Sequence, residues 1–340
     1  MKTRNYNIYI FISTFIRNII DIYSVIYLYR KGIVLKDIIL IYAIVYFLGI
    51  FISKLSINIG YKIGYKYILI ISSIITGITF YIINNSNNIY LIAISLSLST
   101  FTYHPIRHYF GINILKDKKH IGNTLILTYI ATILSSYIVI NNIKIIYLII
   151  LSIVNIIPAI FLTDIKEKKN KTKITKYKLN FFILDQFKIV FILLQPLYLY
   201  MISISISYIG IFNIILTISS IIYTYILANK INIEKNYKYI NIIFCITLLL
   251  KINITNKITL LILAFLEGMG VKSNELVSTI NLYSSKNPNK EYIINCEKIF
   301  CLIRTLLLSI IYFISNIKIS LYILITGIFL LGFQYKKDTI

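Results

Sequence analysis

Asp164-Ile165-Lys166-Glu167-Lys168-Lys169-Asn170-Lys171-Thr172-Lys173-Ile174-Thr175-Lys176-Tyr177-Lys178-Leu179-Asn180 carries seven lysines and interrupts a chain that is otherwise dominated by apolar runs. A polar stretch without an apolar period is typical of a solvated linker. This one lies near the midpoint of the 340 residues. It therefore predicts two halves of similar length.

Composition places both halves in a membrane. The chain is 58% hydrophobic and has a mean hydropathy of +0.80, which is more apolar surface than a soluble core of this length could bury. The net charge of +23 would also suit nucleic acid, but the lysines lie in short loops between apolar runs. We therefore expect anionic lipid headgroups to face this charge, and no nucleic-acid partner.

The apolar runs predict transmembrane helices. Most are about 17–25 residues long, the length that crosses a bilayer, whereas strands of a membrane barrel alternate over about ten residues. The predicted fold class is an all-α membrane protein with twelve transmembrane helices. The expected spans are 8–28, 37–53, 67–84, 89–106, 122–140, 145–163, 181–203, 206–228, 240–255, 258–283, 293–314 and 319–335.

Loop charge predicts the orientation. Most of the 35 lysines and arginines fall in the two tails and in the even-numbered loops, and cytoplasmic loops retain such residues. Both termini are therefore expected in the cytoplasm, in a multi-pass protein of the plasma (cytoplasmic, or inner) membrane. The first outside loop departs from this pattern, because it holds Arg30, Lys31 and Lys36.

A weak internal repeat supports two six-helix bundles. Tyr65-Lys66-Tyr67-Ile68, before the third span, is repeated as Tyr237-Lys238-Tyr239-Ile240 before the ninth. Parallel six-span repeats are a known transporter architecture. The predicted domains are residues 1–164, a linker at 165–180, and residues 181–340.

The loop between the second and third spans carries a family resemblance. It reads Gly60-Tyr61-Lys62-Ile63-Gly64-Tyr65-Lys66, which matches part of the signature of the major facilitator superfamily, with Tyr61 where the family has an acid. Residues 103–110 and 291–304 resemble a poorly characterised prokaryotic branch of that superfamily. The resemblance implies alternating access around a cavity lined by spans 1, 4, 7 and 10. It also implies a cytoplasmic latch at Lys62, Gly64 and Lys66.

Charged residues inside the spans are candidate functional groups, because each is costly to bury in hydrocarbon. Those nearest the midplane, with Arg304 in support, form the predicted substrate or coupling site: Arg17, Asp21, Glu267, Lys272, Glu275 and Arg304. Those near cytoplasmic ends, where charge is cheaper, are predicted to belong to a gate: His104, Arg107, His108, Asp185, Lys188 and Glu297.

More than one role stays open for the midplane residues. Arg17 with Asp21, and Lys272 with Glu275, have helical spacing that suits either structural ion pairs or solute contacts. Glu267 has no basic neighbour three or four positions away, which favours proton coupling unless Arg17 or Arg304 reaches it; a structural hydrogen bond is the simpler role.

Two further pairs also allow more than one role. His104 and His108 are four residues apart, a spacing compatible with a metal, a pH-sensitive gate or an interface, but no metal site is predicted because further ligands are lacking nearby in sequence. Gly268 and Gly270 permit either close helix packing or a bend.

The resulting hypothesis is a secondary transporter or facilitator that moves a small polar or charged solute, with proton coupling as a part to be tested. The rival hypotheses are a flippase for lipids or lipid-linked substrates, a membrane-embedded enzyme and a non-transporting scaffold. The sequence has no phosphate-binding loop and no nucleophile elbow, so we expect neither an enzyme nor a cofactor. The expected partners are the solute, protons and membrane lipids, and the expected state is a monomer.

Overall fold

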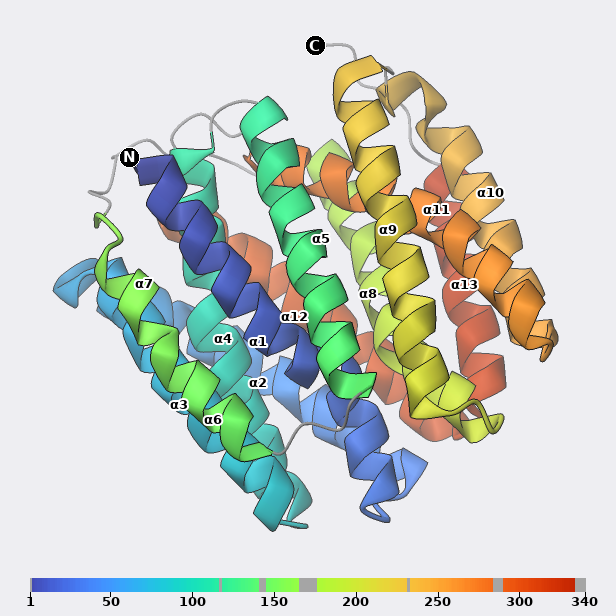
Figure 1. Cartoon of the computed structure of the whole chain (residues 1–340), viewed down its shortest axis with the longest axis horizontal. Helices are drawn as coiled ribbons and strands as arrows, with labels where there is room; N and C mark the ends of the chain where they lie inside the picture. Colours follow the sequence, from blue (N-terminus) through green and yellow to red (C-terminus); the bar gives the residue numbers. More distant parts are fainter. Residues whose placement is uncertain are drawn as a thin grey trace.

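The computed structural model describes residues 2–115, 118–140, 145–164, 176–230, 233–283 and 290–333 (Figure 1). Every regular element within these ranges is an α-helix. The helices are α1 (Lys2–Arg30), α2 (Leu35–Ile63), α3 (Tyr65–Asn85), α4 (Ile89–Ile114), α5 (Lys118–Ile140), α6 (Ile145–Val154), α7 (Ile156–Ile160), α8 (Lys176–Met201), α9 (Ile206–Lys230), α10 (Ile233–Asn253), α11 (Lys257–Tyr283), α12 (Lys290–Ile314) and α13 (Ile317–Phe333).

Length and hydropathy mark most of these helices as membrane-spanning. Among the described residues, seven helices are long and apolar enough to cross a bilayer: α1 to α5, α8 and α9. Three further apolar stretches are shorter and correspond to α6 with α7, α10 and α13. A helix satisfies its own backbone hydrogen bonds, which hydrocarbon requires. The chain is thus an all-helical integral membrane protein, as its composition predicts.

Several helices differ in extent from the predicted spans. The predicted second span ends at residue 53, whereas α2 continues to Ile63. The predicted sixth span is divided into α6 and α7 at Asn155, whose side-chain amide donates to Ser73 Oγ at 3.0 Å. The predicted linker covers residues 165–180, but α8 already begins at Lys176, and 165–175 lie outside the described residues.

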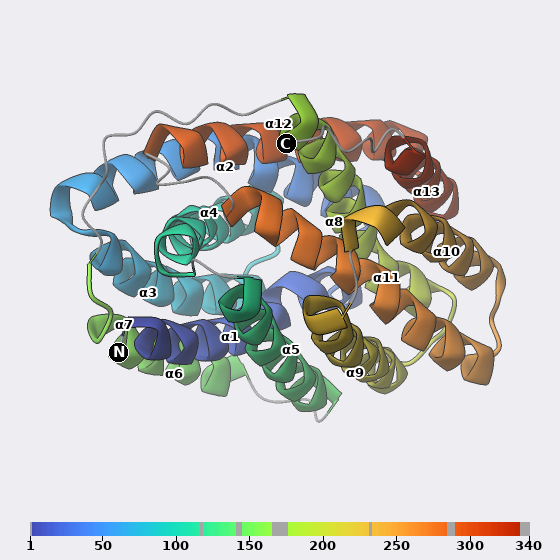
Figure 2. The ribbon, with the colours of Figure 1, turned by 90° about the horizontal axis from the view of Figure 1, so that it is seen from above.

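The same packing pattern occurs twice along the chain. In the first half α2 and α3 pack on α4, α1 packs on α5, and α3 packs on α6; in the second half α9 and α10 pack on α11, α8 packs on α12, and α10 packs on α13. The contacts between the halves also form an equivalent pair, α2 with α12 and α5 with α9 (Figure 2). By their order in the two halves, α2 corresponds to α9 and α5 corresponds to α12, so the two contacts join equivalent helices.

Asparagines begin several helices at the end of the bundle opposite the start of α1. Asn88 Oδ1 accepts hydrogen bonds from the backbone N–H groups of Tyr90 and Leu91, and Asn256 does the same at the start of α11. Such caps satisfy backbone donors that a helix leaves unpaired at its N-terminus. Asn88 and Asn256 are therefore helix-capping residues.

Contacts of Lys31 and Lys36 account for the unexpected charge in the first loop. Lys31 Nζ donates to the backbone carbonyls of Ile83, Asn84 and Ser86 at 2.8, 3.1 and 2.8 Å, which are carbonyls at the C-terminal end of α3. Its partial burial lowers the pKa of the Lys31 ammonium from its ordinary value. Lys36 Nζ lies 4.8 Å from the ring centroid of Tyr312 on α12. These contacts give both cations a structural role.

Candidate functional site

A cavity of about 370 Å³ lies between the two halves. Its walls come from α1, α2, α4 and α5 on one side and from α8, α11 and α12 on the other. Tyr6, Thr124, Leu282 and Glu297 line it near the ends of their helices that face the start of α1. The cavity therefore lies toward that end of the bundle. Its helices include α1, α4, α8 and α11, the counterparts of the predicted cavity spans, together with α2, α5 and α12.

Charged side chains line this cavity from both halves. They comprise the three basic residues Arg107, Lys188 and Arg304, the two acids Asp185 and Glu297, and the two histidines His104 and His108. The six residues predicted as a gate are thus part of the cavity wall. Arg107, His108 and Glu297 lie within eight residues of the helix ends that face the start of α1, whereas Lys188 lies in the middle of α8.

Aromatic contacts join the halves at the opposite end. The rings of Tyr29 on α1 and Tyr200 on α8 meet edge to face with centroids 6.1 Å apart. The Lys36 contact with Tyr312 joins α2 and α12 at the same end. Across the cavity, His108 Nε2 lies 3.9 Å from Glu297 Oε1, which brings α4 and α12 together.

Arg304 is held in a defined orientation on the cavity wall. Its Nε donates a 2.6 Å hydrogen bond to Oε1 of Gln186, and its guanidinium carbon lies 4.9 Å from the ring centroid of Tyr46. Gln186 is fully buried and is itself fixed, because its Nε2 donates to the backbone carbonyl of Phe182 at 3.0 Å. Sequence reasoning missed Gln186, since an uncharged amide in a span gives no signal of its own.

Arg17 lies inside the first half and not on the cavity wall. It is 5% exposed and donates to Ser72 Oγ at 2.7 Å and to Thr76 Oγ1 at 3.0 Å. Its guanidinium carbon is 3.9 Å from the ring centroid of Tyr103. Arg17 does not reach Glu267, whose partners are Lys251 and Gln195, so the exception that the sequence analysis allowed for Arg17 does not apply.

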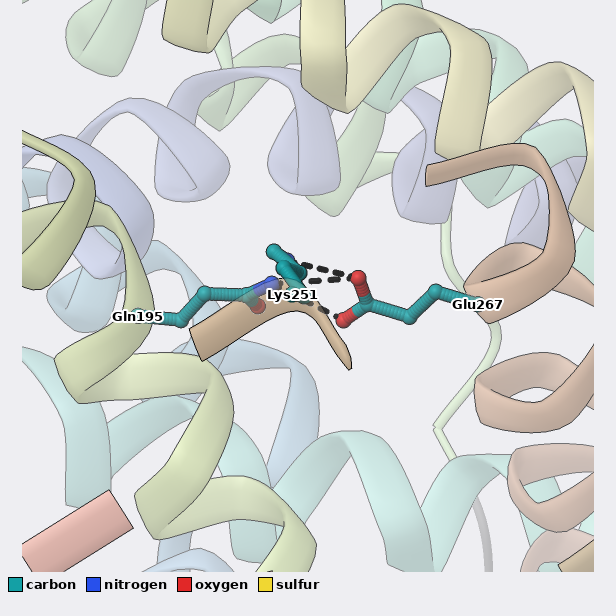
Figure 3. A network of polar contacts seen from close by, with 3 residues as sticks. All are labelled: Gln195, Lys251 and Glu267. Carbon is teal, nitrogen blue, oxygen red and sulfur yellow. Dashed lines mark hydrogen bonds and ion pairs between the residues drawn. The ribbon is translucent and has the colours of Figure 1, made fainter. Parts of the chain in front are cut away.

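Glu267 forms a buried network with Lys251 and Gln195 (Figure 3). Its Oε2 lies 2.6 Å from Lys251 Nζ, and Gln195 Nε2 donates to both carboxylate oxygens at 3.0 and 3.1 Å. The network joins α8, α10 and α11 and contributes nothing to the cavity lining. The partner of Glu267 is thus neither Arg17 nor Arg304 but Lys251, which lies inside the predicted ninth span, and the hydrogen bond from Gln195 on α8 agrees with the structural role named as the simpler one.

The chain shares the fold of a bacterial ferroportin homologue. The crystal structure of a bacterial homologue of the iron transporter ferroportin in an outward-facing state has a TM-score of 0.71 at 10% identity, with 98% of each chain covered. The structure in the outward-facing state with soaked iron has a TM-score of 0.65, again at 10% identity and 98% coverage of each chain. No protein-family model and no curated protein sequence matches the chain. These similarities show a membrane-transporter fold.

The remaining predicted site residues are placed as follows. The side chains of Asp21, Lys272 and Glu275 lie outside the part of the chain that the structure describes. Lys62 is exposed at the end of α2, and Lys66 Nζ lies 5.2 Å from the ring centroid of Tyr67.

Gly64 separates α2 from α3 with a φ of +107°, a conformation that favours glycine. An added Cβ there would lie 2.3 Å from the Asp164 carboxylate, whose Oδ1 accepts from the backbone N–H of Tyr65 at 3.1 Å. Asp164 thus supplies a carboxylate to the loop in which Tyr61 stands at the acidic position of the signature.

The histidine and glycine pairs are placed as follows. The rings of His104 and His108 have centroids 6.4 Å apart, and no group of three His, Cys, Asp or Glu suited to a metal occurs among the described residues. An added Cβ at Gly268 would lie 2.2 Å from the backbone carbonyl oxygen of Leu216, and one at Gly270 would lie 2.6 Å from Phe244. Because α11 runs without interruption through both glycines, close helix packing is their role here.

Proposed function

We propose that this protein is a secondary transporter or facilitator of the major facilitator type that moves a small polar or charged solute by alternating access. The observation that carries the proposal is the cavity between the halves, lined from both sides by charged groups. Its volume of about 370 Å³ lies within the range of roughly 300–1,000 Å³ that is usual for small-molecule sites. A solute of metabolite size fits that volume better than a lipid-linked substrate.

The proposal includes the topology expected from the sequence. It has twelve crossings, one of them formed by α6 together with α7, in two six-helix bundles at residues 1–164 and 181–340. Both termini lie in the cytoplasm, and the protein is a monomer in the plasma membrane. The repeated packing pattern supports two bundles, and the lysine-rich connections support the orientation. In that orientation the cavity lies toward the cytoplasm.

Alternating access requires the opposite end to separate while the halves stay attached. The contacts of α2 with α12 and of α5 with α9 run along the two sides of the interface and can act as the axis of a rocking motion (Figure 2). Opening the far side then breaks the contact between Tyr29 and Tyr200.

Proton coupling is a further part of the proposal. In the buried pair, a proton and the Lys251 ammonium compete for the Glu267 carboxylate, because protonation of the carboxylate removes the charge that holds the lysine. The replacement Glu267→Gln should abolish proton movement driven by the solute in proteoliposomes while leaving solute binding in place. Proton movement at the wild-type rate would exclude coupling at Glu267.

A divalent metal ion is the second candidate solute. It is favoured by the soaked iron in one of the structures of similar fold and by the position of His108 opposite Glu297 in the cavity. Uptake of Fe²⁺ that is lost in His108→Ala would support a metal solute. If the protein takes up organic solutes and Fe²⁺ does not change that uptake, a metal solute is excluded.

A flippase, an enzyme and a scaffold have less support in the structure. A flippase requires a larger cavity than 370 Å³, and an enzyme requires a sizeable outside domain. A scaffold would combine a filled interior with paired midplane charges. The pairing of Glu267 with Lys251 agrees with a scaffold, but the charged cavity favours transport.

Proteoliposome uptake after a thermal-shift screen of metabolites tests the proposal. A solute that raises the melting temperature should also enter vesicles that contain the protein. Cysteines introduced at Tyr29 and Tyr200, joined by a reducible cross-linker, should stop that uptake, and reduction should restore it. The native Cys245, Cys296 and Cys301 are buried, which limits competing reactions. Uptake that continues in the cross-linked protein would contradict alternating access.

A further inference from the structure

We propose that the transported solute carries an oxyanion, a carboxylate or a phosphate group, and that Arg107 and Arg304 bind it from opposite halves of the cavity. This inference rests on the proposed transport and specifies the chemistry of its solute. Three features of the cavity support it: the balance of charge on the wall, the way Arg304 is presented, and the position of Arg107 across the cavity.

Positive charge exceeds negative charge in the described lining. Arg107, Lys188 and Arg304 face two acids, and both acids lie beside basic groups of the protein. Glu297 lies within electrostatic range of Arg304, with its Oε1 3.9 Å from His108 Nε2, and Asp185 lies within electrostatic range of Lys188. The lining as a whole therefore favours an anionic ligand over a cation.

Arg304 is presented in the geometry that an oxyanion requires. Gln186 engages Nε and Tyr46 covers the guanidinium, so the side chain is fixed at the edge away from its two terminal nitrogens. Among the described residues, no carboxylate lies within 4.0 Å of Arg304 in an ion pair. A planar guanidinium with an oriented fork binds carboxylate or phosphate through paired hydrogen bonds. Gln186 is thus a positioning residue.

Arg107 approaches the same region from the first half. It lies on α4 and lines the cavity, and its guanidinium carbon is 6.0 Å from the ring centroid of Tyr103. Both Arg107 and Arg304 lie within electrostatic range of His104 and of His108. An oxyanion near these histidines would experience both guanidinium charges, one from each half.

Four variants of the full-length protein test this site. Binding of succinate and of inorganic phosphate is measured by calorimetry in detergent, with choline and Fe²⁺ as cationic comparators. Arg304→Gln and Arg107→Gln remove one charge from each half. Gln186→Glu keeps a hydrogen-bond acceptor beside Arg304, but its carboxylate neutralises the charge of the arginine. Gln186→Met removes the acceptor. Arg30→Gln, at an exposed arginine on the opposite end, is the matched control.

We expect wild-type protein to bind at least one of the two oxyanions and neither cation. Arg304→Gln and Gln186→Glu should weaken that binding roughly 10- to 100-fold, which corresponds to loss of a charged hydrogen bond. Gln186→Glu should weaken binding more than Gln186→Met, because both variants lose the hydrogen bond to the Phe182 carbonyl but only the glutamate neutralises Arg304. A merely structural amide would not give that order. Arg107→Gln should weaken binding as well, and Arg30→Gln should leave it unchanged.

Three outcomes would overturn the inference: no binding of either oxyanion, wild-type affinity in Gln186→Glu, or wild-type affinity in both arginine variants. If Arg304→Gln does not fold, Gln186→Glu and Arg107→Gln carry the test. Transport is scored separately. Uptake of Fe²⁺ or choline without oxyanion binding rejects the oxyanion site and keeps the transporter, whereas oxyanion binding without vesicle uptake rejects transport and keeps the site.

Discussion

Lys251 Nζ lies 2.6 Å from Glu267 Oε2 in the interior of the second half, where the two side chains are 2% and 0% exposed. The lysine also lies over the ring of Phe212, 3.9 Å from its centroid. Together with Gln195, the pair ties three helices to one another at a place that the cavity does not reach. Its first role is therefore to hold α8, α10 and α11 in register.

Removing one partner of this pair should be costly. Lys251→Met leaves the Glu267 carboxylate buried without its cation, which typically costs about 3–5 kcal/mol. Thermal unfolding in detergent should show a clear fall in melting temperature, and the double variant Lys251→Met with Glu267→Gln should recover part of it. Lys257→Met, at an exposed lysine that begins α11, is the control. A Lys251→Met protein as stable as the wild type would contradict this role.

Arg17 should support stability more than solute affinity. Arg17→Gln loses charged hydrogen bonds to Ser72 and Thr76, each worth about 1.5–3 kcal/mol, and the contact with Tyr103. We expect a lower melting temperature but a solute dissociation constant within a few-fold of the wild type, because Arg17 does not line the cavity. A large loss of affinity at unchanged stability would instead place Arg17 in contact with the solute.

Gly268 should not tolerate a side chain. In Gly268→Ala the new Cβ would lie 2.2 Å from the backbone carbonyl oxygen of Leu216, so α9 and α11 must separate. Overpacking of this kind usually costs about 1–3 kcal/mol. Gly77→Ala is a matched control in α3, because its nearest neighbour would be Ser152 Cβ at an ordinary 3.6 Å. Equal melting temperatures for the two variants would disprove close packing at Gly268.

Lys31 should stabilise the end of α3. Lys31→Met removes three hydrogen bonds to backbone carbonyls, each worth about 0.5–1.5 kcal/mol net, and leaves those carbonyls to water. We expect a lower melting temperature and faster hydrogen exchange at the last turn of α3. Arg30→Gln, at the exposed neighbour in the chain, should change neither measurement. Unchanged exchange in Lys31→Met would show that the cap contributes no stability.

The fold was accessible from the sequence because hydrocarbon imposes long apolar runs and helical backbone on any chain that crosses it. That rule predicted an all-helical membrane protein and located the helices, but it does not fix their ends. It therefore gave no hint that α2 extends ten residues beyond residue 53 or that Asn155 divides the sixth span.

The candidate site was accessible only in part. Depth along a helix indicated which charges are unusual, and Arg304, His104 and Arg107 do line the cavity. Contacts between helices are not encoded in spacing along one helix, so the partnership of Glu267 with Lys251 on α10 could not be predicted. Gln186 and Gln195 carry no charge, so the cost of burying an ionised group does not single them out.

Under the proposed alternating access, the two equivalent contacts between the halves, α2 with α12 and α5 with α9, have a consequence for inhibition. A rigid rotation about an axis through both contacts widens one mouth of the interface by as much as it narrows the other. A compound or antibody fragment wedged into either mouth would therefore block the protein without occupying the solute's position. Such inhibition would not be relieved by raising the solute concentration on the wedged side, which distinguishes a mechanical block from competition.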